Sequence, residues 1–273
     1  MVVGQKEVPV PFFSSPRIAV VELFGVLGSP NRTAEYVRIL ESLRENSAIR
    51  AVVLDIDSPG GSVAASDYLH RSVAKLAAKK PVVAFIRSTG ASGGYMVSCA
   101  ATKVIALPTA IVGSIGAISV RPLLYELLAK LGIRMLVTKS GRLKDMWSSF
   151  REPTEEESEK EQALLDEFYE RFLDTVAKGR RLPLDEVRAL ATGEVFSATR
   201  AHGLGLVDEL GDLDSAIDAA AELGKVPRRV RYVRPRRGLR SLVMSRFAAS
   251  LVDELSVRVE RSLRRHIEYR RPR

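Results

Sequence analysis

Short apolar runs that alternate with helical patterns constrain the fold of this chain more than any other feature of its sequence. From residue 17 onward the alternation recurs roughly every 30 residues, a spacing typical of βα units. The run Ala51–Ile56 is almost wholly apolar, as expected of a parallel strand covered on both faces. Because parallel strands must be joined by crossovers, usually helices, the sequence predicts an α/β fold with a mainly parallel sheet.

The individual elements follow from the same patterns. The expected strands are 18–27, 51–56, 81–86, 103–107 and 134–138, and the expected helices are 33–46, 63–79, 122–131 and 154–178. The last helix opens with Thr154 and has Glu157 three residues later, which is a capping-box pattern. Three prolines in the first 16 residues predict an extended N-terminal arm there.

The positive charge of the chain is concentrated near its C-terminus. The 273 residues carry a net charge of +9, yet residues 225–273 hold 16 Lys or Arg against 4 Asp or Glu, which leaves residues 1–224 at −3. The 46% hydrophobic and 27% charged residues are ordinary for a globular protein and exclude a disordered or collagen-like chain. The charge therefore belongs to a tail rather than to the whole molecule.

The tail has the pattern of a basic amphipathic helix. Apolar residues recur every four positions, with arginines elsewhere on the circumference. The stripe consists of Leu239, Val243, Phe247, Leu251, Leu255, Val259, Leu263 and Ile267. Such a helix over residues 239–269 either lies on an anionic membrane or packs on this chain or a neighbouring copy. No nucleic-acid-binding module is recognisable, so no nucleic acid partner is expected.

Cysteine, histidine and hydropathy exclude several classes of protein. A single cysteine, Cys99, excludes an intramolecular disulfide framework, and three well-separated histidines argue against a metal centre, so neither metal nor cofactor is expected. No apolar run reaches the ~20 residues that a transmembrane helix needs. The N-terminus does not have the pattern of a signal peptide. We expect a cytoplasmic protein or one attached peripherally to a membrane.

Two glycine-rich loops are the candidates for a functional site. The first, DSPGG at residues 57–61, follows the strand 51–56 and precedes a helix. Its two glycines allow close backbone approach and could direct N–H groups into a cleft, but the loop taken alone is better explained as a structural turn. The phosphate-binding patterns G-x-x-x-x-G-K-[ST] and G-x-G-x-x-G are both missing from it.

The second loop places Ser92 among small residues between a strand and a helix. A serine in this position can be an exposed nucleophile with the N–H of Gly93 beside it as an oxyanion donor. The alternative is a serine that caps the helix through its side chain.

A nucleophilic serine needs a base, and histidine is a poor candidate here. No histidine lies between Ser92 and His202, and His70 falls within a helical pattern. A buried lysine can lose its proton and serve as a general base. The segment after the strand at 134–138 offers Lys139 and Lys144, and residue patterns alone do not choose between them.

Four segments in a fixed order resemble one family. DSPGG, GASGGY, TAIVGSIGAI and KSGRLKD together resemble the signal peptide peptidase A family, the S49 serine peptidases. The resemblance covers about residues 17–225 and implies a ClpP/crotonase-type spiral of repeated β-β-α units. The chain then divides into an extended arm (1–16), the S49 peptidase domain (17–225) and a basic amphipathic helical tail (226–273).

The resemblance assigns roles to individual residues. It implies that Ser92 is the nucleophile, that Lys144 is the general base and that the hydroxyl of Ser114 orients the lysine. It also implies an oxyanion hole formed by Gly60, Gly61 and Gly93. A dyad of this kind performs acyl transfer through an acyl-enzyme, which water then hydrolyses.

The family also suggests substrates and partners. By resemblance, the substrates are remnant signal peptides and other hydrophobic or unfolded peptides. The peptidases assemble into homo-oligomeric rings in which serine and lysine meet across a protomer boundary. Members usually carry a transmembrane anchor, which this sequence does not show. Either the anchor precedes the given residues, or this member is soluble or attached peripherally, for which the tail is the candidate. The alternatives are a crotonase-type acyl-CoA enzyme and a non-catalytic membrane-associated scaffold on the same fold.

Overall fold

The structure is a computed structural model that describes residues 17–235. The described chain up to Val233 belongs to one compact unit. The predicted arm 1–16 and the apolar stripe from Leu239 to Ile267 lie outside the described residues. Within the described residues, no helix is both long and apolar enough to span a bilayer.

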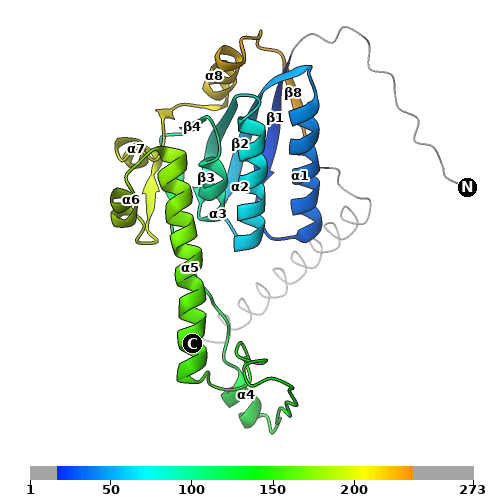
Figure 1. Ribbon diagram of the computed structural model, residues 1–273, viewed down its shortest axis with the longest axis vertical. Coiled ribbons are helices and arrows are strands. Elements are labelled where there is room, and N and C mark those ends of the chain that lie inside the picture. Colours follow the sequence, from blue (N-terminus) through cyan, green and yellow to red (C-terminus); the bar gives the residue numbers. More distant parts are fainter. Residues whose placement is uncertain (1–16, 236–273) are drawn as a thin grey trace, which may run out of the picture. The chain divides into compact units, whose positions relative to one another are not determined.

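Strands and helices alternate along the chain, as the hydrophobic pattern predicts (Figure 1). The strands are β1 (Arg17–Phe24), β2 (Ile49–Ser58), β3 (Val82–Ala91), β4 (Lys103–Ala106), β5 (Ile111–Gly113), β6 (Val195–Ser197), β7 (Glu209–Leu210) and β8 (Val230–Val233). The helices are α1 (Pro30–Glu45), α2 (Val63–Ala77), α3 (Gly93–Ser98), α4 (Tyr125–Lys130), α5 (Glu155–Arg180), α6 (Leu184–Leu190), α7 (Ala198–Gly203) and α8 (Leu213–Gly224).

The sheet has the order β6-β5-β3-β2-β1-β8, and β4 joins β3 to β7 beside this path. Every pairing is parallel except that between β5 and β6. The predicted α/β fold with a mainly parallel sheet is thus confirmed. β1, β2 and β3 form its buried centre, which is why their sequences are so apolar.

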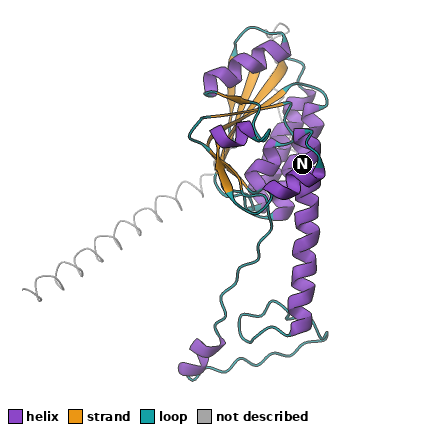
Figure 2. Ribbon diagram, turned by 90° about the vertical axis from the view of Figure 1, so that its left-hand side faces the viewer, coloured by secondary structure: helices purple, strands orange, loops and turns teal. Residues whose placement is uncertain are grey.

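Helices cover both faces of the sheet, and alternate residues of each strand serve one face or the other. Ile18 and Val20 of β1 pack with Ala216 and Ile217 of α8. The intervening residue Ala19 belongs to the larger core cluster, which contains the buried side chains of α1 and α2. Figure 2 shows the strands between these helices.

The register of β2 and β3 brings the two glycine-rich loops together. Ser58, in the DSPGG loop, pairs with Gly90, two residues before Ser92. Because parallel strands have their carboxyl ends at the same edge of a sheet, both loops emerge side by side. The sheet itself therefore positions the site predicted from the two loops.

Residues 117–153 differ from the prediction. The strand expected at 134–138 does not form, and only the short helix α4 occurs in this segment. That strand prediction was wrong because no neighbouring strand is available to pair with these residues. Leu136 is 94% exposed, so the segment forms no core of its own. Both views show the α4 segment beside the N-terminal end of α5, away from the sheet (Figures 1 and 2).

Two further boundaries follow from the structure. Helix α5 begins after Thr154, and the predicted capping box with Glu157 is present. At the other end of the chain, Val230–Val233 pairs with β1 as the edge strand β8. The sheet therefore takes up residues that the sequence division at 225 assigns to the tail.

Candidate active site

Ser92 lies where β3 ends and α3 begins, in an unusual backbone conformation. Its φ is 50° and its ψ is −122°. Four described residues other than glycine have φ in the left-handed region; two of them are helix C-caps and the other two are Ser92 and Ser114. Backbone strain of this kind costs roughly 1–3 kcal/mol per residue and concentrates at functional sites.

The Ser92 hydroxyl is available for chemistry. Ser92 is half-buried between Ala91 and Gly93, which are both buried. Although Ser92 stands at the N-cap position of α3, its side chain makes no capping hydrogen bond. The backbone instead holds the residue, since its N–H donates to the Gly113 carbonyl at 2.8 Å and its own carbonyl accepts from Met96 N–H at 2.9 Å. The helix-cap interpretation of Ser92 therefore fails.

Gly60 packs directly against the nucleophile loop, and its missing side chain makes this contact possible. A Cβ on Gly60 would lie 2.5 Å from the Gly93 nitrogen and 2.8 Å from the Ser92 Cβ. Gly60 also has a φ of +94°, a conformation that other residues rarely adopt. The glycines of DSPGG thus permit close approach to Ser92, so the interpretation as a simple turn is insufficient.

The two glycines of DSPGG differ in the use of their N–H groups. Ser58 is fully buried; its hydroxyl donates to the Gly25 carbonyl at 2.7 Å and accepts the Gly60 N–H at 3.2 Å. Gly61 is exposed, and its N–H has no hydrogen-bond partner within residues 17–235. Of the two, Gly61 is therefore the one whose donor is free for a ligand.

Ser114 lies next to Ser92 across the sheet. Gly113 pairs with Ala91 in the parallel β5–β3 ladder, so the following residues, Ser114 and Ser92, leave the sheet side by side. Ser114 also has a φ of 50°, and its N–H donates to the Glu194 carbonyl at 2.7 Å. The structure thus gathers five of the six predicted site residues: Ser92, Ser114, Gly60, Gly61 and Gly93.

Lys144, the sixth, lies elsewhere. It belongs to the segment beside α4, which lies far from α3 (Figure 1). Lys144 is exposed, and its ammonium group has no hydrogen bond or ion pair to any described residue. Lys139, the competing candidate, is bound to the carboxylate of Asp145. Lys144 is therefore the freer of the two lysines, although one chain does not bring it to Ser92.

An ion-pair network ties the Lys144 loop to helix α5. The Arg151 guanidinium donates to both oxygens of Glu157, at 2.5 and 2.7 Å, and its Nε donates to Asp145 Oδ2 at 3.1 Å. Hydrogen bonds from Arg151 lower the pKa of Glu157 to about 2, with help from the backbone N–H of Thr154. Arg151 and Lys139 also hold the pKa of Asp145 well below its usual range. The network keeps the loop in place at neutral pH.

The remaining titratable candidates have structural roles. His70 Nδ1 lies 2.8 Å from the Met96 carbonyl, and His202 Nδ1 lies 3.1 Å from the Val207 carbonyl. Burial raises the pKa of the Cys99 thiol to about 12, so it is a poor nucleophile. Among the described residues, no cluster of three or more His, Cys, Asp or Glu side chains could hold a metal ion.

Sequence patterns did not identify Ser58 or Ser66 as parts of this site. Ser66 is buried on α2, and a Cβ on Gly93 would lie 2.0 Å from its hydroxyl oxygen. The position of Ser58 inside DSPGG was the available signal for its role. Ser66 follows the loop by several residues, and only the packing of α2 against α3 reveals its contact.

The chain is similar in sequence to known proteases. The model of peptidase family S49 matches residues 74–227, more than half of the chain. A candidate protease of Methanocaldococcus jannaschii is 39% identical over 191 residues, which are 70% of this chain and 61% of that protein. The chloroplastic serine protease SPPA of Arabidopsis thaliana is 32% identical over 201 residues, which are 73% of this chain and 30% of that protein.

A solved structure of a membrane-bound stomatin-specific protease is similar in fold. It has a TM-score of 0.53 and 15% sequence identity, and the match covers 82% of this chain and 100% of that one. The fold is that of the ClpP-like α/β proteins, as predicted. Fold and site together define a peptidase-like protein with a serine at the end of a parallel strand. The chain belongs to peptidase family S49.

Proposed function

We propose that this protein is a serine endopeptidase in which Ser92 is the nucleophile and Lys144 is the general base. The observation that carries the proposal is the conformation of Ser92. Its backbone is held at a φ of 50°, the residue is half-buried, its side chain makes no capping bond, and Gly60 of the DSPGG loop packs against it. A serine whose side chain does not cap its helix, and which is held in a strained conformation, is typical of an activated nucleophile.

The chemistry follows from the groups around Ser92. Neutral Lys144 accepts the hydroxyl proton while the oxygen attacks the scissile carbonyl carbon. The N–H groups of Gly93 and Gly61 stabilise the resulting oxyanion, since the Gly60 N–H is bound to Ser58. The lysine then gives its proton to the leaving amine, an acyl-enzyme remains on Ser92, and water hydrolyses this ester. Ser114 accompanies Ser92 at the sheet edge and orients the lysine.

A second copy of the chain supplies the lysine in this proposal. An exposed lysine is protonated at neutral pH, and burial favours the neutral form that a base requires. Lys144 is exposed and has no side-chain partner among residues 17–235, and the large apolar side chains of residues 127–150 are exposed too. These side chains are Leu127, Leu131, Ile133, Met135, Leu136, Val137, Trp147 and Phe150. A neighbouring copy that covers this segment would bury the apolar surface and desolvate the lysine together, within a homo-oligomeric ring.

Hydrophobic or unfolded peptides, including remnant signal peptides, are the proposed substrates. The support is the family. A peripheral contact of residues 239–269 with anionic membrane remains a proposal from the sequence, outside the described residues.

A fluorophosphonate probe tests the nucleophile, because it reacts covalently with activated serines. We expect labelling at Ser92 in the wild type, located by peptide mass spectrometry, and no labelling in Ser92→Ala. Ser88→Ala is the matched control, since Ser88 is an exposed serine on the same strand and its hydroxyl makes no hydrogen bond within the described chain. Cleavage of a hydrophobic peptide should be lost only in Ser92→Ala. Cleavage retained in that variant would overturn the proposal.

A further inference from the structure

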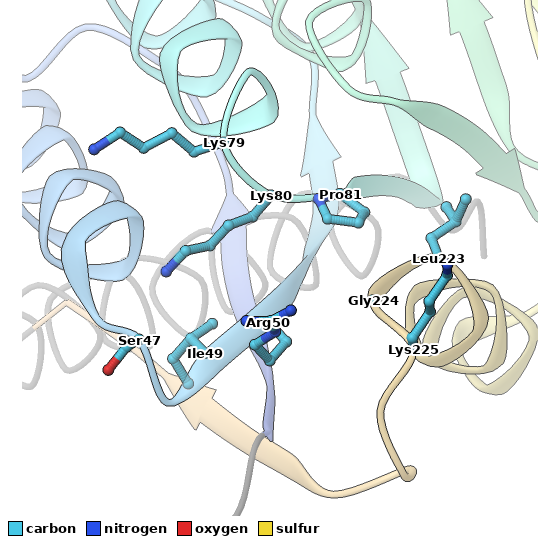
Figure 3. Close-up of a pocket in the computed structure, with 9 residues that line it drawn as sticks. All are labelled: Ser47, Ile49, Arg50, Lys79, Lys80, Pro81, Leu223, Gly224 and Lys225. Carbon is cyan, nitrogen blue, oxygen red and sulfur yellow. The ribbon is translucent and has the colours of Figure 1, made fainter.

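A basic pocket lies at the opposite end of the strands from Ser92. Its volume is about 240 Å³, and it is lined by Ser47, Ile49, Arg50, Lys79, Lys80, Pro81, Leu223, Gly224 and Lys225. Four of these nine residues are cationic and none is acidic. They come from the start of β2, the chain after α2 and the end of α8 (Figure 3).

Two of the four cations are already bound within the protein. Lys80 donates to the carbonyls of Leu43 and Asn46, both at 2.6 Å, and Lys79 contacts both oxygens of Glu45 at 3.0 Å. Figure 3 shows both ammonium groups directed toward α1. These two lysines therefore complement the negative C-terminal end of α1, as cations at helix ends commonly do.

The other two cations, Arg50 and Lys225, are not explained in this way. Neither side chain makes a hydrogen bond or an ion pair with any residue of the described chain. Arg50 is the second residue of β2 and so caps no helix. Lys225 follows α8, but only its backbone N–H contacts the helix carbonyls.

Placing these charges together is unfavourable without an anion. Burial lowers the pKa of Lys80, and the positive charges of Lys79 and Arg50 act in the same direction, opposed only by Glu45. Glu45 does not line the pocket and is already shared with Lys79 and Arg44. An anionic ligand would relieve this repulsion and would find donors on both sides of the pocket.

We propose that this pocket binds the phosphate group of an anionic ligand, with Arg50 and Lys225 as its charged contacts. The guanidinium of Arg50 offers a fork that can bind two phosphate oxygens at once, whereas Lys225 contributes a compact charge from the other wall. Lys80 retains one unused N–H, since an ammonium group has three donors and two are bound. A free phosphate ester and the headgroup of an anionic phospholipid present the same chemistry to these residues.

Binding to the full-length chain tests the proposal without reference to peptidase activity. The probes are inorganic phosphate, titrated calorimetrically at constant ionic strength, and phosphatidylglycerol vesicles in a phosphatidylcholine background, measured by co-sedimentation. The test variant is Arg50→Gln/Lys225→Gln. The control is Lys178→Gln/Arg181→Gln, which removes the same charge from two exposed residues, and Arg181 is a left-handed helix C-cap like Lys225.

We expect saturable phosphate binding that weakens at least about tenfold in the test variant and is unchanged in the control, as loss of two charge-assisted contacts requires. Vesicle binding that falls in the same variant identifies a lipid headgroup as the source. Vesicle binding that matches the control assigns the pocket to a soluble phosphate ester. Lack of saturable phosphate binding by the wild type, or equal binding by both double variants, would overturn the proposal.

Discussion

The strand ends around Ser92 and the segment around Lys144 are built in opposite ways. The first region is buried and crowded: Gly60, Gly93 and Gly94 each lie where a Cβ would collide with atoms of a neighbouring segment. In the second, residues 117–153 contain only the short helix α4, none of whose residues is buried. The surroundings of Ser92 are therefore complete within one chain, whereas Lys144, the other member of the proposed dyad, lies on an exposed surface.

This difference shows which part of the proposed mechanism depends on a second copy. The proposed nucleophile and oxyanion donors are positioned by the sheet, whose centre is the most buried part of the described chain. The loop that carries the proposed base is held by an ion-pair network at the N-terminal end of α5, and the proposal requires another copy to cover it. A peptidase organised in this way would be inactive as a monomer, because the base stays solvated.

Replacing the two candidate lysines should give the largest contrast. Lys144→Ala removes the base and should lower peptide cleavage by about 10²–10⁴-fold. The melting temperature should stay unchanged, because Lys144 is exposed and its side chain has no partner in the described part of the chain. Lys139→Ala is the matched control and should keep most of the activity, since it loses only an ion pair with Asp145. Similar losses of activity in both variants would contradict the assignment of Lys144, rather than Lys139, as the base.

Glycine substitutions should show that the Ser92 region tolerates no added atoms. Gly60 and Gly193 have similar positive φ values, +94° and +87°, but only Gly60 lacks space for a Cβ. Both alanine variants should lose about 1–2 kcal/mol of unfolding free energy through backbone strain. Gly60→Ala should lose a further ~1–3 kcal/mol through overpacking, together with its cleavage activity. Equal denaturation midpoints for the two variants would contradict the close approach of Gly60 to Ser92.

The ion-pair network of Arg151, Asp145 and Glu157, which holds the Lys144 loop, should persist until the pH is unusually low. The folded-state pKa of Glu157 is lowered to about 2, so its contribution to stability is complete above the usual glutamate pKa and is lost as the pH falls through about 2. Glu157→Gln removes the charge at every pH. Hydrogen exchange should then accelerate at residues 139–153 and not at the Ser92 loops. Unchanged exchange at 139–153 would show that another contact holds the segment.

The smallest expected effect concerns the reactivity of a cysteine thiol in each region, which reports directly on how buried that region is. The pKa of Cys99 is raised to about 12 by burial, so iodoacetamide should not react with it at neutral pH in the folded protein. A cysteine introduced by Leu136→Cys, at a position that is 94% exposed, should react at once. A fast reaction of Cys99 in the wild type would indicate that the Ser92 region opens readily.

Much of the first region could be predicted from the sequence, because local patterns decide it. Apolar runs ending in glycines predicted the parallel strands and the two loops at their ends. The capping box predicted where α5 begins. The left-handed conformation of Ser92 could not be predicted, since residue type disfavours it and only the tertiary packing imposes it.

The second region was harder to predict because its side chains do not pack into the core of their own chain. The run 134–138 has the apolar character of a strand but finds no partner strand. The sequence patterns also left Lys139 and Lys144 undecided. The ion pair between Lys139 and Asp145 separates them, and such a contact depends on how the loop folds back toward α5. Strand β8 was missed for the same reason. Its four residues follow a helix and pair with β1, a strand that is distant in the sequence.

Mixed assemblies of two inactive variants test the central claim most directly, namely that Ser92 and Lys144 act from different copies. Differently tagged Ser92→Ala and Lys144→Ala chains are co-expressed, and oligomers that carry both tags are purified. If the dyad forms across copies, about a quarter of the sites regain both groups, and cleavage returns to roughly that fraction of the wild-type rate. Pairing Ser92→Ala with Ser92→Ala/Lys144→Ala should restore nothing. Mixed oligomers of the first pair that stay as inactive as this control would contradict the account.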